Sequence, residues 1–321
     1  MGVGVKVMKS RLPQFYALSG ILALVPLLAH AQSSTTTSSK PWSQQTTSEL
    51  IASAPADAWQ ALDPSQTLYL DFEPRPGATP VRVIIALAPD LAPNHVAAVK
   101  ALVGAKFFDN RAIVRSQDNY VAQWGDGAAA LALNLPGAKM EPEFDKVMGA
   151  EFRPSGLHDG DVYAKRVGIW RNWPVAWDPS TRRAWLPHCY GMIGAGRDDA
   201  GNSGGPAEMY VVTGHSPRAL DRNVTLFGRV VRGMEHLTTL PRGTEALGFY
   251  GEGQVKPKII AIRLASELPP EQRENLQVLR TDHPIYADLL ESRRNRRDSW
   301  TLYKADRLEI CNAPLPVRVA P

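Results

Sequence analysis

The sequence predicts a mainly β fold with some α-helix, an antiparallel barrel or sandwich that carries helices. Two patterns point to this class. Several short runs of β-favouring residues are separated by Gly- and Pro-containing turns, whereas few segments have the period of a helix that covers a core. The 321 residues are 44% hydrophobic and 21% charged, which is ordinary for a globular protein with a full-sized core.

The N-terminal residues are predicted to be an export signal and a flexible linker. Residues 1–31 have a basic start, an apolar run that is short for a membrane span, and an A-x-A cleavage site at Ala29-His30-Ala31. Residues 32–48 are rich in Ser, Thr and Gln and nearly without apolar side chains, as in disordered segments. We therefore expect a mature soluble protein in the periplasm, with no membrane span after signal cleavage. A retained N-terminal anchor is the alternative.

The chain then predicts a hairpin followed by a helix. An N-terminal extension at 49–66 contains a possible short helix over 49–60. The β-favouring runs at 67–72 and 81–87 flank a Pro- and Gly-rich turn, which is typical of a hairpin. Over 91–104, apolar residues recur at helical spacing and a glycine ends the pattern, so we expect a helix that covers the core.

The stretch RSQDNYVAQWGD, residues 115–126, places a fixed cation and an amide beside an aromatic and an aliphatic residue. If it is a strand of period two, Tyr120 faces away from Val121 and Gln123, and Arg115 enters from the preceding loop. Taken alone, the stretch fits an ordinary half-buried strand with a surface arginine. The remainder of the chain decides between that interpretation and a functional one.

The second half of the chain adds an insertion, further strands and a C-terminal extension. Residues 127–190 have an irregular pattern in which tryptophans crowd between Trp170 and Trp185, among Pro, Arg and Gly. We expect an insertion that packs on the body through its tryptophans rather than a separate domain. The other expected elements are strands at 208–213, 225–231 and 258–265, a helix at 233–240, and, in a C-terminal extension at 266–321, polar helices at 271–279 and 283–297.

The cysteines and the net charge bear on whether the protein binds a metal or nucleic acid. Cys189 and Cys311 are the two cysteines, and in an oxidising compartment they could pair and join the C-terminal tail to the middle of the chain. Two separate buried thiols fit equally well. The Cys and His spacings do not resemble a zinc site, so we expect no metal. A net charge of +4 and a pI near 9.0 favour anionic surfaces slightly and do not indicate nucleic-acid binding.

Four segments, in order, resemble the cyclophilin family of peptidyl-prolyl isomerases over Thr67 to Ala265. They are VRVIIALAPDLAPNHVAAVKALV, RSQDNYVAQWGD, AEMYVV and LDRNVTLFGRVVRGMEHL. The first is similar to the family's strand, turn and helix, and the second to its Arg-aromatic-aliphatic-Gln string. The third is similar to its Ser-Gln-Phe-Phe-Ile strand, and the fourth to its Leu-Asp, Phe-Gly-x-Val and Gly-Met elements. The resemblance implies a closed antiparallel β-barrel capped by two helices. It also implies a monomer that needs no cofactor and acts on unfolded or partly folded Pro-containing polypeptides.

The resemblance implies roles for single residues. Arg115 would be the catalytic arginine, and Gln123 would support both that arginine and the substrate. A catalyst of X-Pro rotation needs no nucleophile; it needs donors for the twisted amide and an apolar grip on the proline ring. The substrate-binding residues implied are Tyr120, Val121, Tyr210, Leu220 and Glu208, the last of which stands where the family usually has Gln. Whether Glu208 holds Arg115 or competes with substrate for it is open.

Two other functions must be weighed against the isomerase. A non-catalytic peptide-binding or chaperone domain would keep the fold and lose the activity if Glu208 silences Arg115. GNSGGP at 201–206 matches the nucleophile motif of HtrA-type serine proteases, and His95, Asp126 and Ser203 follow the order of their triad. His95, however, lies on the apolar face of a predicted helix, and AEMYVV continues the cyclophilin pattern. The sequence therefore favours the isomerase.

Overall fold

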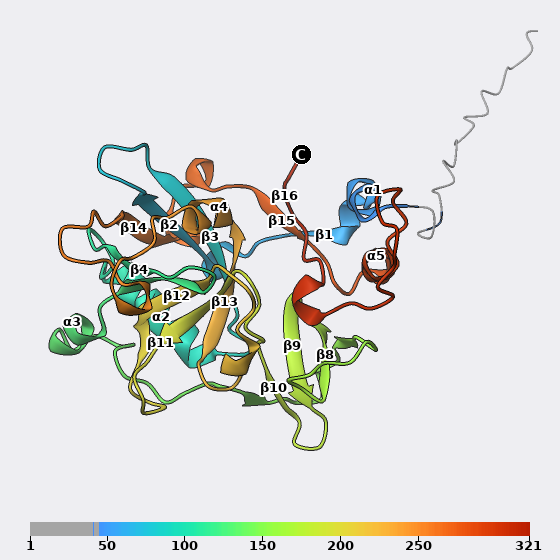
Figure 1. The fold of residues 1–321 in the computed structure, drawn as a ribbon, viewed down its shortest axis with the longest axis horizontal. Helices are drawn as coiled ribbons and strands as arrows, with labels where there is room; N and C mark the ends of the chain where they lie inside the picture. Colours follow the sequence, from blue (N-terminus) through green and yellow to red (C-terminus); the bar gives the residue numbers. More distant parts are fainter. Residues whose placement is uncertain (1–40, 42–44) are drawn as a thin grey trace, which may run out of the picture. The chain divides into compact units, whose positions relative to one another are not determined.

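The computed structural model describes residue 41 and residues 45–321, and the predicted signal and most of the predicted linker lie outside the described residues (Figure 1). The main body is an antiparallel eight-stranded sheet. Its strands are β2 Thr67–Glu73, β3 Val81–Leu87, β4 Ile113–Ser116, β5 Val121–Gly125, β11 Met192–Gly196, β12 Gly205–Val212, β13 Leu226–Arg232 and β14 Lys258–Leu264.

The sheet curls until its two edges almost meet. The strand order is β14-β2-β3-β13-β11-β12-β5-β4, and a bridge between Ala112 and Lys258 links the edge next to β4 with β14. This arrangement is a nearly closed antiparallel barrel, so the predicted mainly β fold is confirmed. The nearly complete closure leaves few unpaired strand edges.

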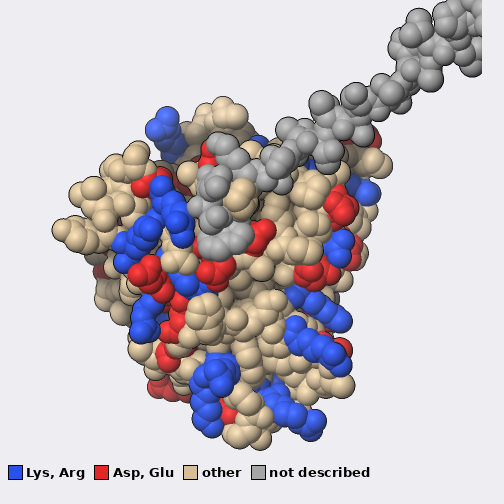
Figure 2. Space-filling model, turned by 90° about the vertical axis from the view of Figure 1, so that its right-hand side faces the viewer, with Lys and Arg blue, Asp and Glu red and all other residues tan. Residues whose placement is uncertain are grey.

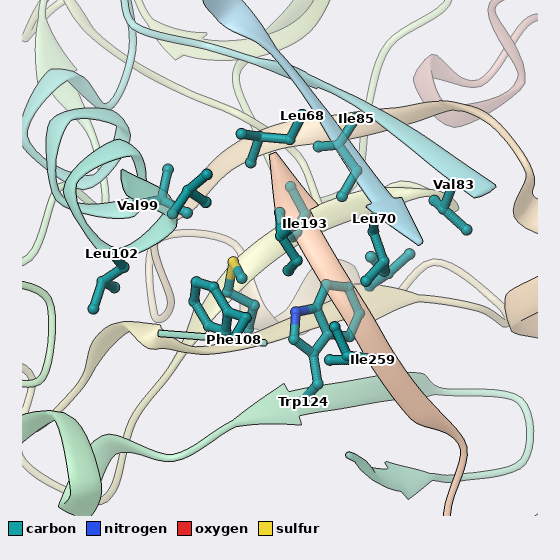
Figure 3. Close-up of a cluster of buried hydrophobic side chains, with 14 of the residues drawn as sticks. Leu68, Leu70, Val83, Ile85, Val99, Leu102, Phe108, Trp124, Ile193 and Ile259 are labelled. Carbon is teal, nitrogen blue, oxygen red and sulfur yellow. The ribbon is translucent and has the colours of Figure 1, made fainter. Parts of the chain in front are cut away.

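The barrel interior is filled by alternate side chains of its strands. On β2, Leu68, Leu70 and Phe72 point inward and are fully buried. Helix α2, Pro93–Gly104, adds apolar side chains from one turn to the next, among them Val99 (Figure 3). Helix α4, Met234–Thr238, has Gly233 as its N-cap residue and packs against β3. The two predicted helices thus lie where they cover the barrel core.

The insertion at 127–190 contains a second sheet, which its irregular sequence pattern did not indicate. After α3, Gly127–Ala132, the chain forms an antiparallel sheet of order β6-β10-β9-β8-β7. Trp170 and Trp173 pack in one buried cluster with Val121 and Tyr210 of the barrel, so this sheet covers part of the barrel's outer surface. The strands are β6 Lys146–Val147, β7 Ser155–Gly156, β8 Arg166–Trp170, β9 Trp173–Asp178 and β10 Arg183–Trp185.

The two ends of the described chain form a third sheet together. Strands β1 Trp59–Ala61, β15 Leu276–Leu279 and β16 Val317–Val319 are antiparallel neighbours, and helix α1, Thr47–Ser53, packs on α5, Pro284–Arg294. The helices predicted at 49–60 and 271–279 are therefore wrong in part, since each segment ends in a strand. Tertiary pairing outweighs local helix propensity in both segments.

A disulfide and buried ion pairs hold these parts to one another. Cys189 and Cys311 are bonded, with 5.0 Å between their Cα atoms. Arg218 of the barrel pairs with Asp161 of the insertion at 2.9 Å, and both side chains are almost fully buried. None of the helices in residues 45–321 is long and apolar enough to cross a membrane. On the face in Figure 2, acidic and basic side chains lie beside one another between wide uncharged areas.

Removing the disulfide should destabilise the protein. The bond closes a loop of 122 residues, and a covalent link of this kind restricts the unfolded chain more than the folded one. We expect the double variant C189A/C311A to lose about 2–5 kcal/mol of unfolding free energy in urea titrations. The intact protein titrated with a reductant present is the control and should shift by a similar amount. Unchanged midpoints in both experiments would contradict the expected contribution.

Candidate active site

Arg115 is part of strand β4, and the prediction that it enters from a loop is wrong. The register places Arg115 opposite Gln123 of β5, and Gln123 opposite Tyr210 of β12. Residues paired directly across neighbouring antiparallel strands lie on the same face of the sheet. The three side chains therefore form a row across β4, β5 and β12, on the outer face of the barrel.

Three hydrogen bonds hold the guanidinium of Arg115. Its Nη1 donates to Oε1 of Gln123 at 3.0 Å, its Nε donates to the carbonyl of Leu247 at 2.6 Å, and its Nη2 donates to Oε1 of Gln117. A guanidinium has five N–H donors, and these contacts use three of them. The group is therefore fixed in place while two N–H donors stay available to a ligand.

The charge of Arg115 has only neutral acceptors around it. Burial lowers the pKa of its guanidinium from the usual arginine value, opposed by the nearby Tyr120. No carboxylate within the described residues forms an ion pair with Arg115, whereas the buried Arg218 and Arg294 each pair with an aspartate. Because no carboxylate neutralises it, the positive charge acts directly on whatever occupies the face of the sheet.

A loop far along the chain completes the surroundings of Arg115. Phe249 forms an isolated bridge with Arg115, and the guanidinium carbon lies 5.2 Å from the Phe249 ring and 5.5 Å from the Tyr120 ring. Leu247 takes a left-handed φ of 59°, a conformation that leucine seldom adopts. A Cβ on Gly248 would lie 2.5 Å from the Cα of Gln117, so a side chain does not fit there. The sequence analysis expects no helix or strand in this segment and singles out neither Leu247 nor Phe249.

Tyr120 and Val121 pack on the same cluster, and the prediction that they face opposite ways is wrong. Asn119 has a left-handed φ of 49°, and β5 begins only at Val121, so the alternation of a strand does not extend to Tyr120. Val121 is 2% exposed and Tyr210 is 7% exposed, both next to tryptophans of the insertion. Tyr120 is partly exposed and forms the open side of this apolar group.

Tyr210 belongs to a series of buried, hydrogen-bonded polar side chains. Its hydroxyl lies 2.9 Å from Nε2 of His188, whose ring is stacked on the tyrosine, and Nδ1 of His188 lies 3.1 Å from Oδ1 of Asp221. Since a carboxylate only accepts, Nδ1 carries a proton, and in a neutral ring Nε2 accepts from the hydroxyl. Burial raises the pKa of Tyr210, so this hydroxyl stays protonated. Nothing in the sequence pattern indicated this pairing.

Among the described hydrogen bonds and ion pairs, none joins Glu208 or Leu220 to the guanidinium. Glu208 is opposite Gly125 in the register, farther along β12, and lines a cavity of about 300 Å³ together with Ser203. None of the described ion pairs joins it to Arg115, and it is absent from the charges that act on that arginine. Leu220 ends the short turn Arg218–Leu220 directly before Asp221 and is half-buried.

The three residues proposed for a protease triad each bind a different partner and do not bind one another. Oγ of Ser203 donates to the carbonyl of Ala200 at 2.5 Å. The buried His95 holds Glu143 through Nδ1 at 2.7 Å. Asp126 caps helix α3 and pairs with an arginine instead. A serine triad needs these three side chains hydrogen-bonded in series, so the arrangement does not support it. Within residues 45–321, no group of three or more His, Cys, Asp or Glu is placed to hold a metal ion.

Comparison with known proteins agrees with this geometry. The family model for cyclophilin-type peptidyl-prolyl cis-trans isomerase/CLD matches residues 75–275, more than half of the chain. A probable peptidyl-prolyl cis-trans isomerase of Brucella suis is 27% identical over 187 residues, which cover 58% of this chain and 76% of that protein, and one of Brucella abortus matches equally well. The crystal structure of a cyclophilin from Hirschia baltica has a similar fold, with a TM-score of 0.63 and 22% identity over 87% of this chain and 99% of its own.

The hydroxyl of Tyr210 should contribute to stability. The variant Tyr210→Phe keeps the ring and leaves Nε2 of the fully buried His188 without its donor. We expect its free energy of unfolding to fall by about 1–3 kcal/mol in denaturant titrations. Tyr120→Phe removes a hydroxyl from a partly exposed ring and is the matched control, with an expected change within about 0.5 kcal/mol. Equal effects of the two substitutions on the free energy of unfolding would show that the buried hydrogen bond of Tyr210 does not stabilise the protein.

Proposed function

Because the chain belongs to the cyclophilin-type peptidyl-prolyl cis-trans isomerases, we propose that Arg115 is the group that lowers the barrier to X-Pro rotation. The enzyme isomerises peptide bonds that precede proline, and its substrates are proline-containing polypeptides. The observation that carries the role of Arg115 is its setting: a guanidinium fixed by three neutral acceptors, unpaired with any described carboxylate, and beside the partly exposed ring of Tyr120.

The mechanism follows from the electronic change during rotation. Twisting an X-Pro amide removes its resonance and meets a barrier of roughly 18–20 kcal/mol. As the bond twists, the prolyl nitrogen becomes pyramidal and gains a lone pair that can accept a hydrogen bond. A free N–H of Arg115 donates to this nitrogen or to the displaced carbonyl oxygen, and it does so more strongly in the twisted state than in either planar state. No covalent intermediate is required.

Gln123 and the apolar residues have supporting parts in this proposal. Gln123 holds Nη1 of Arg115, so its amide fixes the direction of the remaining N–H donors. Tyr120 offers the partly exposed wall, with Val121 and Tyr210 behind it, against which a proline ring packs. Holding the ring still while the residue before it turns confines rotation to one side of the bond. Arg115 and Gln123 are therefore the proposed catalytic residues.

The structure gives no specific support to the two alternatives. A silenced, purely peptide-binding domain required Glu208 to pair with Arg115, and the guanidinium instead bonds to neutral acceptors. The protease required a serine triad that the chain does not assemble. Isomerisation is the activity that the geometry supports best.

Replacing Arg115 should remove most of the activity. We expect Arg115→Ala to lower kcat/KM by about 10²–10³-fold, the usual effect of losing one donor to a developing charge. Arg115→Lys should fall nearly as far, because an ammonium cannot keep the three-way bonding of a planar guanidinium. The measurement is the cis/trans relaxation of a proline-containing tetrapeptide. If the wild-type protein leaves that relaxation at its uncatalysed rate, the isomerase assignment itself is wrong.

Two controls separate the alternatives in the same assay. Ser203→Ala should leave kcat/KM for isomerisation unchanged. If Ser203 were a protease nucleophile, this substitution would remove the activity. Glu208→Gln should change kcat/KM by less than about threefold, because the carboxylate lies outside the hydrogen bonds of Arg115. A large gain in Glu208→Gln would instead show that this acid suppresses the arginine.

We also propose that the enzyme works outside the cytoplasm, in the periplasm. The signal-like residues 1–31 and the disulfide between Cys189 and Cys311 support this location, because disulfides persist in oxidising compartments. Expressed in a Gram-negative host, the protein should appear in the periplasmic fraction with an N-terminus near Gln32. An uncleaved protein in the membrane fraction would indicate a retained anchor. An uncleaved protein in the cytoplasm would overturn the proposal.

A further inference from the structure

A cavity with a volume of about 680 Å³ does not include the residues proposed for catalysis. Tyr190 and three segments line it: the insertion loop 159–163, the barrel loop 214–218 and the C-terminal segment 307–312. Two of these segments lie outside the barrel. The cavity is therefore a feature that the insertion and the C-terminal extension add to the fold.

The walls of this cavity are held rigidly. Arg218 is 4% exposed and donates to Asp161 at 2.9 and 3.0 Å and to Asp221 at 2.6 Å, which joins the insertion loop to the barrel loop. Asp159 pairs with Arg294 of α5 at 2.7 Å, and Cys311 is bonded to Cys189. Because these contacts fix the wall segments to one another, little ordering is needed when a ligand binds.

The rim of the cavity is apolar and exposed. Val162 is 91% exposed, Tyr163 is 53% exposed and Tyr190 is 51% exposed, although such side chains gain free energy by leaving water. The ring of Tyr163 lies over the guanidinium of Arg218, 5.1 Å from its central carbon. The aspartates of the wall are neutralised by arginines, and the exposed apolar side chains of the rim lie beside polar lining residues of the other two segments, such as Arg307 and Asn312. Such a pocket suits a large apolar side chain.

One wall of the cavity is in contact with the chain segment that precedes the proposed active site. The backbone N–H of His215 donates to Oδ1 of Asn119 at 2.7 Å, and that of Thr213 donates to the carbonyl of Tyr120 at 2.8 Å. Gly214, in the cavity wall, lies so close to Asn119 that an added Cβ would meet its carbonyl carbon at 2.1 Å. Tyr120 is next in sequence and borders Arg115. The loop that lines the cavity is therefore bonded to the residue on which the proline is proposed to pack.

We propose that this cavity is a second subsite of the isomerase, which binds an aromatic or large aliphatic side chain of the same polypeptide a few residues from the X-Pro bond. The inference rests on the proposed function, because it places the proline beside Arg115 and Tyr120. Unfolded chains expose large apolar side chains as well as prolines, so both features mark the same class of substrate. Binding at a point remote from the reacting bond is equal in the planar and twisted states, so it lowers KM and leaves kcat unchanged.

The test compares matched peptides with the full chain. One substrate is a short Ala-Ala-Pro-type tetrapeptide. The others are two pairs of longer peptides that carry either phenylalanine or serine four residues from the proline, before it in one pair and after it in the other. For the wild-type protein we expect the phenylalanine peptide of one orientation to exceed its serine partner about tenfold in kcat/KM, through KM. In Tyr163→Ala and in Val162→Ser, the ratio of kcat/KM between the phenylalanine and serine peptides should fall toward one. Both variants should isomerise the tetrapeptide with the kcat/KM of the wild type.

A matched control and clear outcomes complete the design. Tyr303 is 93% exposed and does not line the cavity, so Tyr303→Ala should keep the full ratio. Val162 is almost wholly in solvent, so Val162→Ser tests the rim without disturbing the fold. A ratio of one in the wild type, or a ratio that survives in both rim variants, overturns the subsite.

Failure of the proposed function would look different. In that case even the tetrapeptide would not be turned over, and the subsite would be judged by direct binding of the longer peptides, measured by calorimetry. Tighter binding of the phenylalanine peptide that is lost in Tyr163→Ala supports the subsite independently of catalysis. Equal binding of the phenylalanine and serine peptides overturns it.

Discussion

The buried guanidinium of Arg218 is the contact on which the arrangement of the other parts depends. A charge removed from water costs several kcal/mol unless opposite charges and hydrogen bonds replace the solvent, and Asp161 and Asp221 together supply them. Asp161 belongs to the insertion, and Asp221 continues through His188 to the hydroxyl of Tyr210. One charge cluster therefore joins the insertion to the barrel and positions an aromatic wall of the active site.

Arg115 shows what the same kind of side chain does in the opposite setting. Arg218 is neutralised by aspartates, so its charge is used within the fold, whereas Arg115 is held by two glutamine side chains and a carbonyl. Neutral acceptors fix a guanidinium without cancelling its charge. The difference in partners, rather than the difference in burial, separates a structural arginine from one suited to a developing lone pair.

Sequence reasoning succeeded where local pattern and fold agree. The strand 81–87 was predicted with the bounds that the structure has, and Tyr120 and Gln123, which were singled out with Arg115 in one stretch, lie beside its guanidinium. It failed where long-range pairing decides. The two-residue strands β6 and β7 are too short to leave a pattern, and 276–279 becomes a strand only because β1 and β16 pair with it. Phe249 reaches Arg115 across 134 residues by a bridge that no local pattern contains.

The insertion also decides how a substrate can approach. Trp170 and Trp173 share one buried cluster with Val121 and Tyr210, so the part of the site left to solvent is the row of Arg115 and Gln123 together with the exposed side of Tyr120. Next to Tyr120, Asn119 accepts a hydrogen bond from the barrel loop and contacts Gly214. That loop also lines the cavity, together with another part of the insertion and the C-terminal segment. The cavity wall therefore begins beside the residue that precedes Tyr120, against which the proline is proposed to pack.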